Sequence, residues 1–253
     1  MIVDFHLHLL DEPAFIEDHL RKMDDADVQY SLLHALPPFT FVGHPCSGND
    51  DVLGAVESHP DRFLGSVYLD PREKEWRLML EKYLDAGFRC VKMFPPVGFY
   101  PDDDRFEPVF DLLNQMKMPV LMHAGVTNFP GTDSKFADPL RLDGLLRKYP
   151  DIRFILAHWG GLGTFPLAWA LMKANSNIYL DASGRRWCWP GVALYHVYEP
   201  VTPLDFNRVL WGTDNLVDPK QDMADNLSIL HEIGKEGYKD RFFGETARMI
   251  LGL

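Results

Sequence analysis

Short apolar runs and longer amphipathic runs alternate along the whole chain. The apolar runs are rich in Val, Ile, Leu, Phe and Tyr and mostly lack a strict alternation of apolar and polar positions, which is typical of strands buried on both faces. Predicted strands lie at residues 2–9, 29–36, 63–69, 90–94, 120–124, 154–158, 178–181 and 209–213. Between them, stretches such as residues 75–86 and 106–116 place apolar side chains on one side at helical spacing, which indicates amphipathic helices.

The alternation of strands and helices predicts a single α/β domain over residues 1–253, a (β/α)8 TIM barrel. An open doubly wound sheet is the alternative. The connections entering the strands are short, as at residues 86–88, whereas those leaving them at residues 37–49, 95–105 and 125–137 are long. Long loops after the strands are typical of barrels that carry a site at that end, so they favour the barrel. The length of 253 residues also suits it, because such barrels need about 250 residues.

The acidic charge balance argues against one large class of partner. The chain has 25 Lys and Arg against 37 Asp and Glu, a net charge of −12, whereas a nucleic-acid binder shows a basic face. No apolar run reaches the roughly 18 residues of a membrane span. The N-terminal MIVDFHLHLL lacks the basic region and cleavage site of a signal peptide. We therefore expect a cytoplasmic protein that binds neither nucleic acid nor membrane. The three cysteines have no C-x-x-C spacing, so they predict neither a disulfide framework nor structural zinc.

Histidines and one aspartate stand at the ends of the predicted strands. His6 and His8 are two residues apart in the first strand, so their side chains lie on the same face. Such a pair alone is weak evidence for a metal. However, His123 ends the fifth strand, His158 ends the sixth and Asp214 follows the eighth. Because the same ends of parallel strands meet at one mouth of a barrel, these side chains together predict a metal site there.

Several motifs recur in a known superfamily. They are Asp4-Phe5-His6-Leu7-His8, residues 91–95 (VKMFP), 157–161 (AHWGG), 180–184 (LDASG) and 211–214 (WGTD), with the C-terminal residues 245–253. In these motifs the chain resembles the amidohydrolase superfamily, specifically the amidohydrolase-2 branch related to aminocarboxymuconate semialdehyde decarboxylase. The resemblance covers the whole chain and implies a metal-dependent TIM-barrel enzyme, without specifying its substrate.

The resemblance also implies roles for individual residues. His6, His8, His123 and Asp214 would ligate or border one catalytic divalent metal, and His158 would be a further ligand or would orient water or substrate and hold the attacked oxygen. Imidazole and carboxylate ligands suit zinc best, with manganese or iron as alternatives; a second metal is not expected. A bound metal lowers the pKa of its water towards about 7. Asp214 would then act as the general base that passes a proton to the leaving group.

Four further residues are expected to bind the substrate: Lys92, Trp159, Arg185 and Arg186. Lys92 lies near the end of the fourth strand, where the alternatives are a carboxylated lysine bridging two metals or a lysine that reaches solvent. The arginine pair follows the seventh strand and could grip a carboxylate, with a solvated loop as the alternative. Trp159 belongs to a set of aromatic residues in the predicted mouth loops that indicates a partly apolar pocket wall. Its other members are Phe39, Phe41, Phe94, Phe99, Tyr100, Phe129, Trp187 and Trp189.

We expect hydrolysis of a C–N or C–O bond (amide, lactone or ester) of a small anionic molecule by metal-bound hydroxide. The alternative is decarboxylation of an unsaturated or aromatic carboxylic acid at the same site, which Lys92, the arginine pair and the aromatic residues favour. A polynuclear phosphoesterase would need more ligands at the ends of the second and third strands, and a non-catalytic scaffold would not need this ligand set. Relatives often associate through their outer helices, so a homo-oligomer is a further expectation.

Overall fold

The computed structural model describes residues 1–41, 43–161, 163–184, 191–201 and 203–253. Its main sheet is entirely parallel, with the strand order β1-β2-β5-β6-β7-β8-β9-β10 that follows the chain. The strands are β1 Ile2–His8, β2 Val28–His34, β5 Phe63–Tyr68, β6 Cys90–Met93, β7 Val120–Met122, β8 Phe154–Leu156, β9 Ile178–Asp181 and β10 Val209–Leu210. Each lies within or next to a predicted run, and the (β/α)8 barrel is confirmed.

The last strand meets the first, which distinguishes a barrel from an open sheet. The Phe5 N–H donates to the Trp211 carbonyl oxygen (3.1 Å), and the Asp214 N–H donates to the His6 carbonyl oxygen (2.7 Å). Glycine is required at position 212 for this approach, because a Cβ atom there would lie 2.6 Å from His6 Cβ. Closure of the barrel therefore brings Asp214 beside the histidines of β1.

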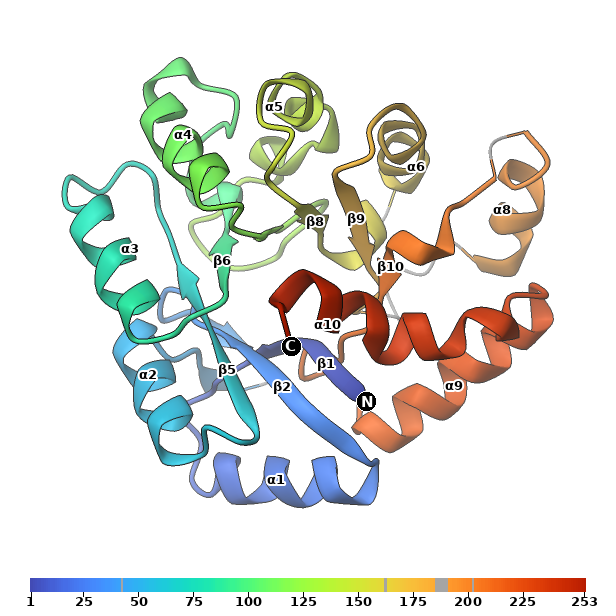
Figure 1. Cartoon of the computed structure of the whole chain (residues 1–253), viewed down its shortest axis with the longest axis horizontal. Coiled ribbons are helices and arrows are strands. Elements are labelled where there is room, and N and C mark those ends of the chain that lie inside the picture. The colour runs from blue at the N-terminus through green and yellow to red at the C-terminus, as the bar shows by residue number, and fades with distance from the viewer. Residues whose placement is uncertain (42, 162, 185–190, 202) are drawn as a thin grey trace.

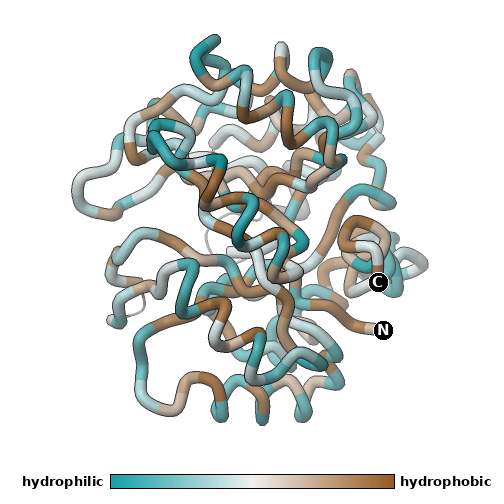
Figure 2. Tube along the Cα trace, turned by 60° about the vertical axis from the view of Figure 1, so that its left-hand side comes forward, coloured by the Kyte–Doolittle hydropathy of each residue, from teal (hydrophilic) through white to brown (hydrophobic). Residues whose placement is uncertain are grey.

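Helices form a ring around the strands (Figure 1). They are α1 Phe15–Asp25, α2 Asn49–Ser58, α3 Trp76–Asp85, α4 Glu107–Gln115, α5 Asp143–Lys148, α6 Phe165–Ala174, α8 Gly191–Tyr198, α9 Pro219–Glu232 and α10 Thr246–Leu251. Figure 2 shows hydrophobic and hydrophilic positions alternating along the helices, as expected when one face packs on the strands. In the part of the chain that the structure describes, no helix is both long and apolar enough to cross a membrane.

The two ends of the barrel differ. At one end, Ala247, Ile250 and Leu251 of α10 pack with apolar side chains from inside the barrel. The N- and C-termini lie close together at this end (Figures 1 and 2). At the other end, the loops that follow the strands form short turns and the hairpin of β3 Thr40–Phe41 and β4 His44–Pro45. The polar side chains predicted from the sequence lie at this second end, which we call the mouth.

Candidate metal centre

Three potential metal ligands converge at the mouth. His6 Nε2 lies 3.1 Å from His8 Nε2, and Asp214 Oδ1 lies 3.5 Å from the first and 3.4 Å from the second. All three residues are buried. Ligand atoms that share a divalent ion at bond lengths of about 2.0–2.2 Å are separated by about 3–3.5 Å. The spacing of these three atoms therefore fits a single ion.

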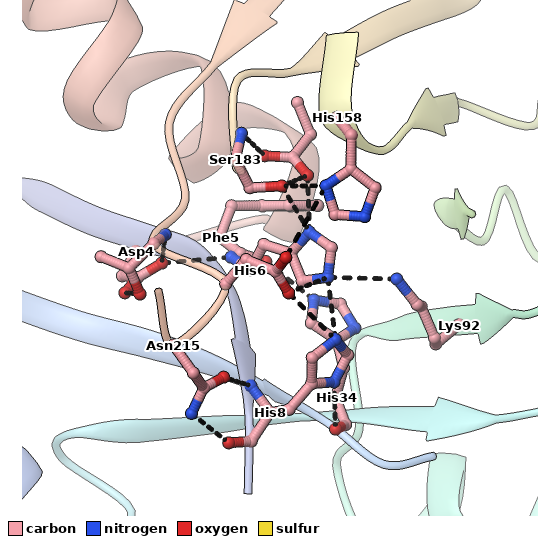
Figure 3. Close-up of polar contacts among 12 residues, drawn as sticks. Asp4, Phe5, His6, His8, His34, Lys92, His158, Ser183 and Asn215 are labelled. Carbon is pink, nitrogen blue, oxygen red and sulfur yellow. Dashed lines mark hydrogen bonds and ion pairs between the residues drawn. The ribbon is translucent and has the colours of Figure 1, made fainter. Parts of the chain in front are cut away.

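Hydrogen bonds fix which nitrogen of each imidazole ring faces this point. His6 Nδ1–H donates to Asp181 Oδ2 (2.6 Å), and His8 Nδ1–H donates to the His34 carbonyl oxygen (3.0 Å). These acceptors assign the proton to Nδ1 in both rings, so each Nε2 carries a lone pair. The Nε2 lone pairs of His6 and His8 are thus turned towards one another (Figure 3), and Asp214 Oδ1 lies within 3.5 Å of both nitrogen atoms. Two lone pairs and a carboxylate oxygen at one buried point favour a cation, so the chemistry of these residues fits a metal ion.

Asn215 holds the backbone of His8. The His8 N–H donates to Asn215 Oδ1 (2.7 Å), and Asn215 Nδ2–H donates to the His8 carbonyl oxygen (2.8 Å), as Figure 3 shows. Asp214 and Asn215 both have left-handed backbone conformations, with φ of 52° and 58°, which asparagine and aspartate tolerate better than most residues. This double hydrogen bond fixes the metal ligand of β1 against the segment that carries Asp214.

Asp181, Ser183 and His158 form a second layer around His6. Ser183 Oγ–H donates to Asp181 Oδ2 (2.6 Å) and lies 3.1 Å from His158 Nδ1. Because the hydroxyl proton points to Asp181, the Ser183 oxygen accepts from His158 Nδ1–H. His6, His158 and Asp181 could also form a group of metal ligands. The His6 Nδ1 proton already bonds Asp181, so we assign this layer to orientation of the rings.

The acid–base properties follow from burial and charge. Burial would raise the pKa of the Asp214 carboxyl, but His158, His8 and Lys92 together hold it below its usual value. Burial raises the pKa of Asp181 to about 7, against the hydrogen bonds from Ser183. Burial lowers the pKa of His158 to about 4. At neutral pH the site therefore holds an ionised Asp214 and a neutral His158.

Lys92 and His123 were both predicted to reach this site. Lys92 is 1% exposed, and its Nζ lies 3.1 Å from His6 Nε2. Burial lowers the pKa of its ammonium to about 8, opposed by the carboxylates of Asp214 and Asp181. The His123 ring centroid lies 5.1 Å from that of His158, and the buried His123 Nε2 has no hydrogen-bond partner. A free buried nitrogen suits a ligand, but no three-residue ligand group among the described residues includes His123, so its ligation stays a prediction.

Of the other residues predicted to bind the substrate, the structure describes only Trp159. Arg185 and Arg186, together with Trp187 and Trp189, lie outside the described residues. Trp159 is 1% exposed and packs edge-on against Phe165. Its backbone φ of 58°, like the 57° of His158, ends β8 in a left-handed turn. Binding of substrate by these residues stays a prediction.

Four phenylalanines from three mouth loops adjoin the ligands and form what we call the phenylalanine cluster: Phe39, Phe41, Phe94 and Phe129. Phe129 stacks on Phe39 (ring centroids 4.9 Å apart) and meets Phe41 edge-on (5.9 Å). Phe41 lies 6.0 Å from the His8 ring, and Phe94 lies 4.5 Å from the His123 ring. Four of the aromatic residues that the sequence placed in the mouth loops thus lie beside the candidate ligands, and their role as a pocket wall stays a prediction.

Sequence reasoning missed Asp181, Ser183, His34 and Asn215. Asp181 stands at the end of a predicted strand, as His123 and His158 do, so its position could have identified it as a residue of the site. The other three act through contacts with residues distant in sequence, such as the bond from His8 to the carbonyl oxygen of His34. No local pattern predicts such contacts.

Comparison with known proteins shows the family and the fold of the chain. A model of the amidohydrolase family matches residues 3–253, whereas no curated protein matches the sequence. An uncharacterised TIM-barrel protein from Bordetella bronchiseptica has a TM-score of 0.76 at 19% identity, covering 99% of this chain and 98% of the other. A probable 2-pyrone-4,6-dicarboxylic acid hydrolase from Acinetobacter baumannii has a TM-score of 0.70 at 13% identity, covering 100% and 99%.

A third similar structure contains a metal. It is a 5-carboxyvanillate decarboxylase from Novosphingobium aromaticivorans with bound manganese and 3-methoxy-4-hydroxy-5-nitrobenzoic acid. Its TM-score is 0.62 at 19% identity, and the alignment covers 93% of this chain and 80% of the other. At these identities the three structures establish a shared fold, and a probable hydrolase and a decarboxylase are both found among them.

Proposed function

Because the chain belongs to the amidohydrolase family, we propose that this enzyme hydrolyses a C–N or C–O bond (amide, lactone or ester) of a small anionic molecule with the help of one divalent metal. The observation that carries the proposal is the convergence of His6 Nε2, His8 Nε2 and Asp214 Oδ1. His6, His8 and Asp214 would hold the metal, with His123 as a further ligand. Zinc suits these ligands best, and manganese is the alternative that the similar decarboxylase contains. When bound, the ion would supply Lewis acidity that activates water and polarises a substrate oxygen.

Asp214 supplies the proton transfer. Interactions with His158, His8 and Lys92 keep the pKa of Asp214 low despite its burial, so the carboxylate is ionised at neutral pH. Its Oδ1 atom faces the histidine ligands, while Oδ2 lies 3.8 Å from His158 Nδ1. The carboxylate can accept a proton from the attacking water and pass it to the leaving group as the bond breaks.

His158 is the second catalytic candidate. Its ring is neutral at pH 7, because burial lowers its pKa to about 4. With Nδ1–H donated to Ser183 Oγ (3.1 Å), Nε2 carries a lone pair and can accept a hydrogen bond from water or substrate. Stabilising the attacked oxygen, as expected from the sequence, would need the other tautomer of this ring.

A specific observation favours decarboxylation as the second candidate function. The buried Lys92 ammonium and the phenylalanine cluster lie on the ligand side of the mouth, next to His6, His8 and His123. A cation and an aromatic wall would suit an aromatic carboxylic acid. In that reaction Asp214 or His158 would take a proton from water and pass it to the carbon atom that carbon dioxide leaves.

Two measurements test these proposals. Metal analysis of the purified enzyme should find about one equivalent of zinc or manganese per chain, and His8→Ala should lose most of it. Unchanged metal content in that variant would refute the assignment. A panel of lactones, esters and amides is then compared with a panel of aromatic and unsaturated carboxylic acids, with carbon dioxide release as the readout for the second. If the enzyme releases carbon dioxide from a carboxylic acid and hydrolyses no lactone, ester or amide, decarboxylation would replace hydrolysis as the proposed function.

A further inference from the structure

Lys92 lies beside the candidate metal ligands. Its side chain extends from β6 towards His6 (Figure 3), and Nζ lies 3.1 Å from His6 Nε2. The lysine nitrogen therefore lies beside an electron pair that would bind the metal.

The lysine and a metal ion require the same lone pair. His6 Nδ1–H is donated to Asp181 Oδ2 at 2.6 Å, so Nε2 has no proton and Lys92 Nζ must be the donor in their contact. An imidazole nitrogen has one lone pair, which can accept the N–H of Lys92 or bind a metal ion. Binding of a metal to His6 Nε2 thus requires Lys92 Nζ to leave it.

We propose that Lys92 occupies the cation position of the metal-free enzyme, and that metal binding releases its ammonium to bind the anionic group of the substrate. A lysine that is 1% exposed needs a new acceptor once it leaves His6, because an unpaired buried charge is costly. A substrate carboxylate entering the mouth supplies that acceptor. The second half of this inference rests on the proposed function, since it takes the substrate to be anionic.

The opposite role for this lysine makes the inference testable. If the Nζ atom were carboxylated, it would be a metal ligand, and removing it would weaken metal binding. If it is a competing ammonium, removing it strengthens metal binding, because both a competing donor and a like charge disappear. The two roles predict changes of opposite sign.

The first experiment titrates zinc into metal-free wild type and Lys92→Met, using a chromophoric chelator as competitor. Lys92→Met should bind zinc about tenfold more tightly or better. Lys92→Gln, which also lacks the charge, should change affinity in the same direction and guards against a folding defect in the first variant. The matched control is Lys82→Met, which removes an exposed lysine paired with Asp50 on the outer surface and should leave zinc affinity unchanged.

Unchanged or weaker zinc binding in both Lys92 variants would overturn the inference, and weaker binding would indicate a carboxylated ligand. If the wild type itself binds no zinc, the proposed function fails instead, so the two failures are distinguishable.

The second experiment measures binding of benzoate, as a carboxylate probe, to the zinc-loaded proteins by calorimetry. Lys92→Met should bind benzoate about tenfold more weakly than wild type or Lys82→Met. Equal affinity in all three would show that the released ammonium does not meet the anion and would overturn the second half of the inference.

Discussion

Hydrogen-bond partners decide what each histidine of the mouth can bind. His6 and His8 donate through Nδ1 and keep Nε2 free for a ligand role. His34 does the reverse, since its Nε2–H donates to the Phe5 carbonyl oxygen at 2.8 Å. Its ring therefore joins β2 to β1, although it lies only 5.1 Å from the His6 ring. Proximity of an imidazole to the site does not make it a ligand, because its free nitrogen must also lie near the other ligand atoms; within the described part of the chain, His34 belongs to no three-residue ligand group.

Asn215 provides a prediction at the same scale. Its amide fixes the backbone of His8 through both the N–H and the carbonyl oxygen, so Asn215→Ala should let His8 move relative to Asp214. We expect zinc affinity to fall about 10- to 100-fold, the usual effect of losing a residue that orients a ligand. A chelator competition assay measures it.

The matched control for this variant is Asn114→Ala. Asn114 Oδ1 also accepts a backbone N–H, that of Asp151 at 3.0 Å, but it lies on α4 away from the mouth. The variant Asn114→Ala should therefore leave zinc affinity unchanged. If Asn215→Ala binds zinc as tightly as this control, Asn215 does not position His8.

At the scale of elements, the apolar runs predicted all eight strands, because parallel strands in a barrel are buried on both faces. Their C-terminal ends were placed too late in most cases. β8 ends at Leu156 rather than at His158, since His158 and Trp159 adopt a left-handed turn. The ligand positions were still predictable, because a residue just beyond a strand reaches the mouth as well as one within it.

What the sequence did not predict is the pairing between distant segments. Asp181 meets His6 across the barrel, and Asn215 meets His8. Both contacts depend on the curvature of the sheet, which brings the end of β9 and the segment after β10 within side-chain reach of β1. Hydrophobic periodicity reports which face of an element is buried, and it carries no information on which distant side chain will face it.

Gly212 tests the closure of the barrel at this scale. A Cβ atom on residue 212 would lie 2.6 Å from His6 Cβ and 2.8 Å from the His6 nitrogen, so Gly212→Ala should push the end of β10 away from β1. We expect unfolding to become easier by about 1–3 kcal/mol, as for other overpacked sites, and metal binding to weaken. Urea denaturation and zinc titration measure the two effects.

Gly54→Ala is the matched control for this substitution. Gly54 lies in α2, and a Cβ atom there would meet nothing within 4 Å. It should cause neither loss of stability nor loss of metal. If Gly212→Ala behaved in the same way, the close approach of β10 to β1 would not be needed for the site.

At the scale of the whole molecule, one end of the barrel contributes apolar packing and the other end carries the candidate metal centre. One end is filled by apolar side chains of α10 and the inner strand faces. The mouth instead holds buried charged groups, among them Lys92, Asp181 and Asp214. Groups of this kind are costly to bury unless they are paired. The mouth is therefore the end that gains most from a bound cation. Assembly into a homo-oligomer through the outer helices stays a prediction.

Metal should consequently stabilise the entire barrel. Three of its candidate ligands, His6, His8 and Asp214, come from β1 and from the segment after β10, the two edges that must meet for closure. Binding to the folded state at a free concentration of 100 times Kd adds about 2.7 kcal/mol, which for a chain of this size raises Tm by roughly 5–10 °C. Scanning calorimetry of the chelator-treated protein with and without zinc measures this shift.

Two histidine variants serve as controls for the position of the zinc. His231→Ala, which removes an exposed histidine of α9, should keep the shift in Tm, whereas His8→Ala should lose it. A shift retained in His8→Ala would place the stabilising zinc elsewhere on the molecule and refute the link between the mouth and barrel closure.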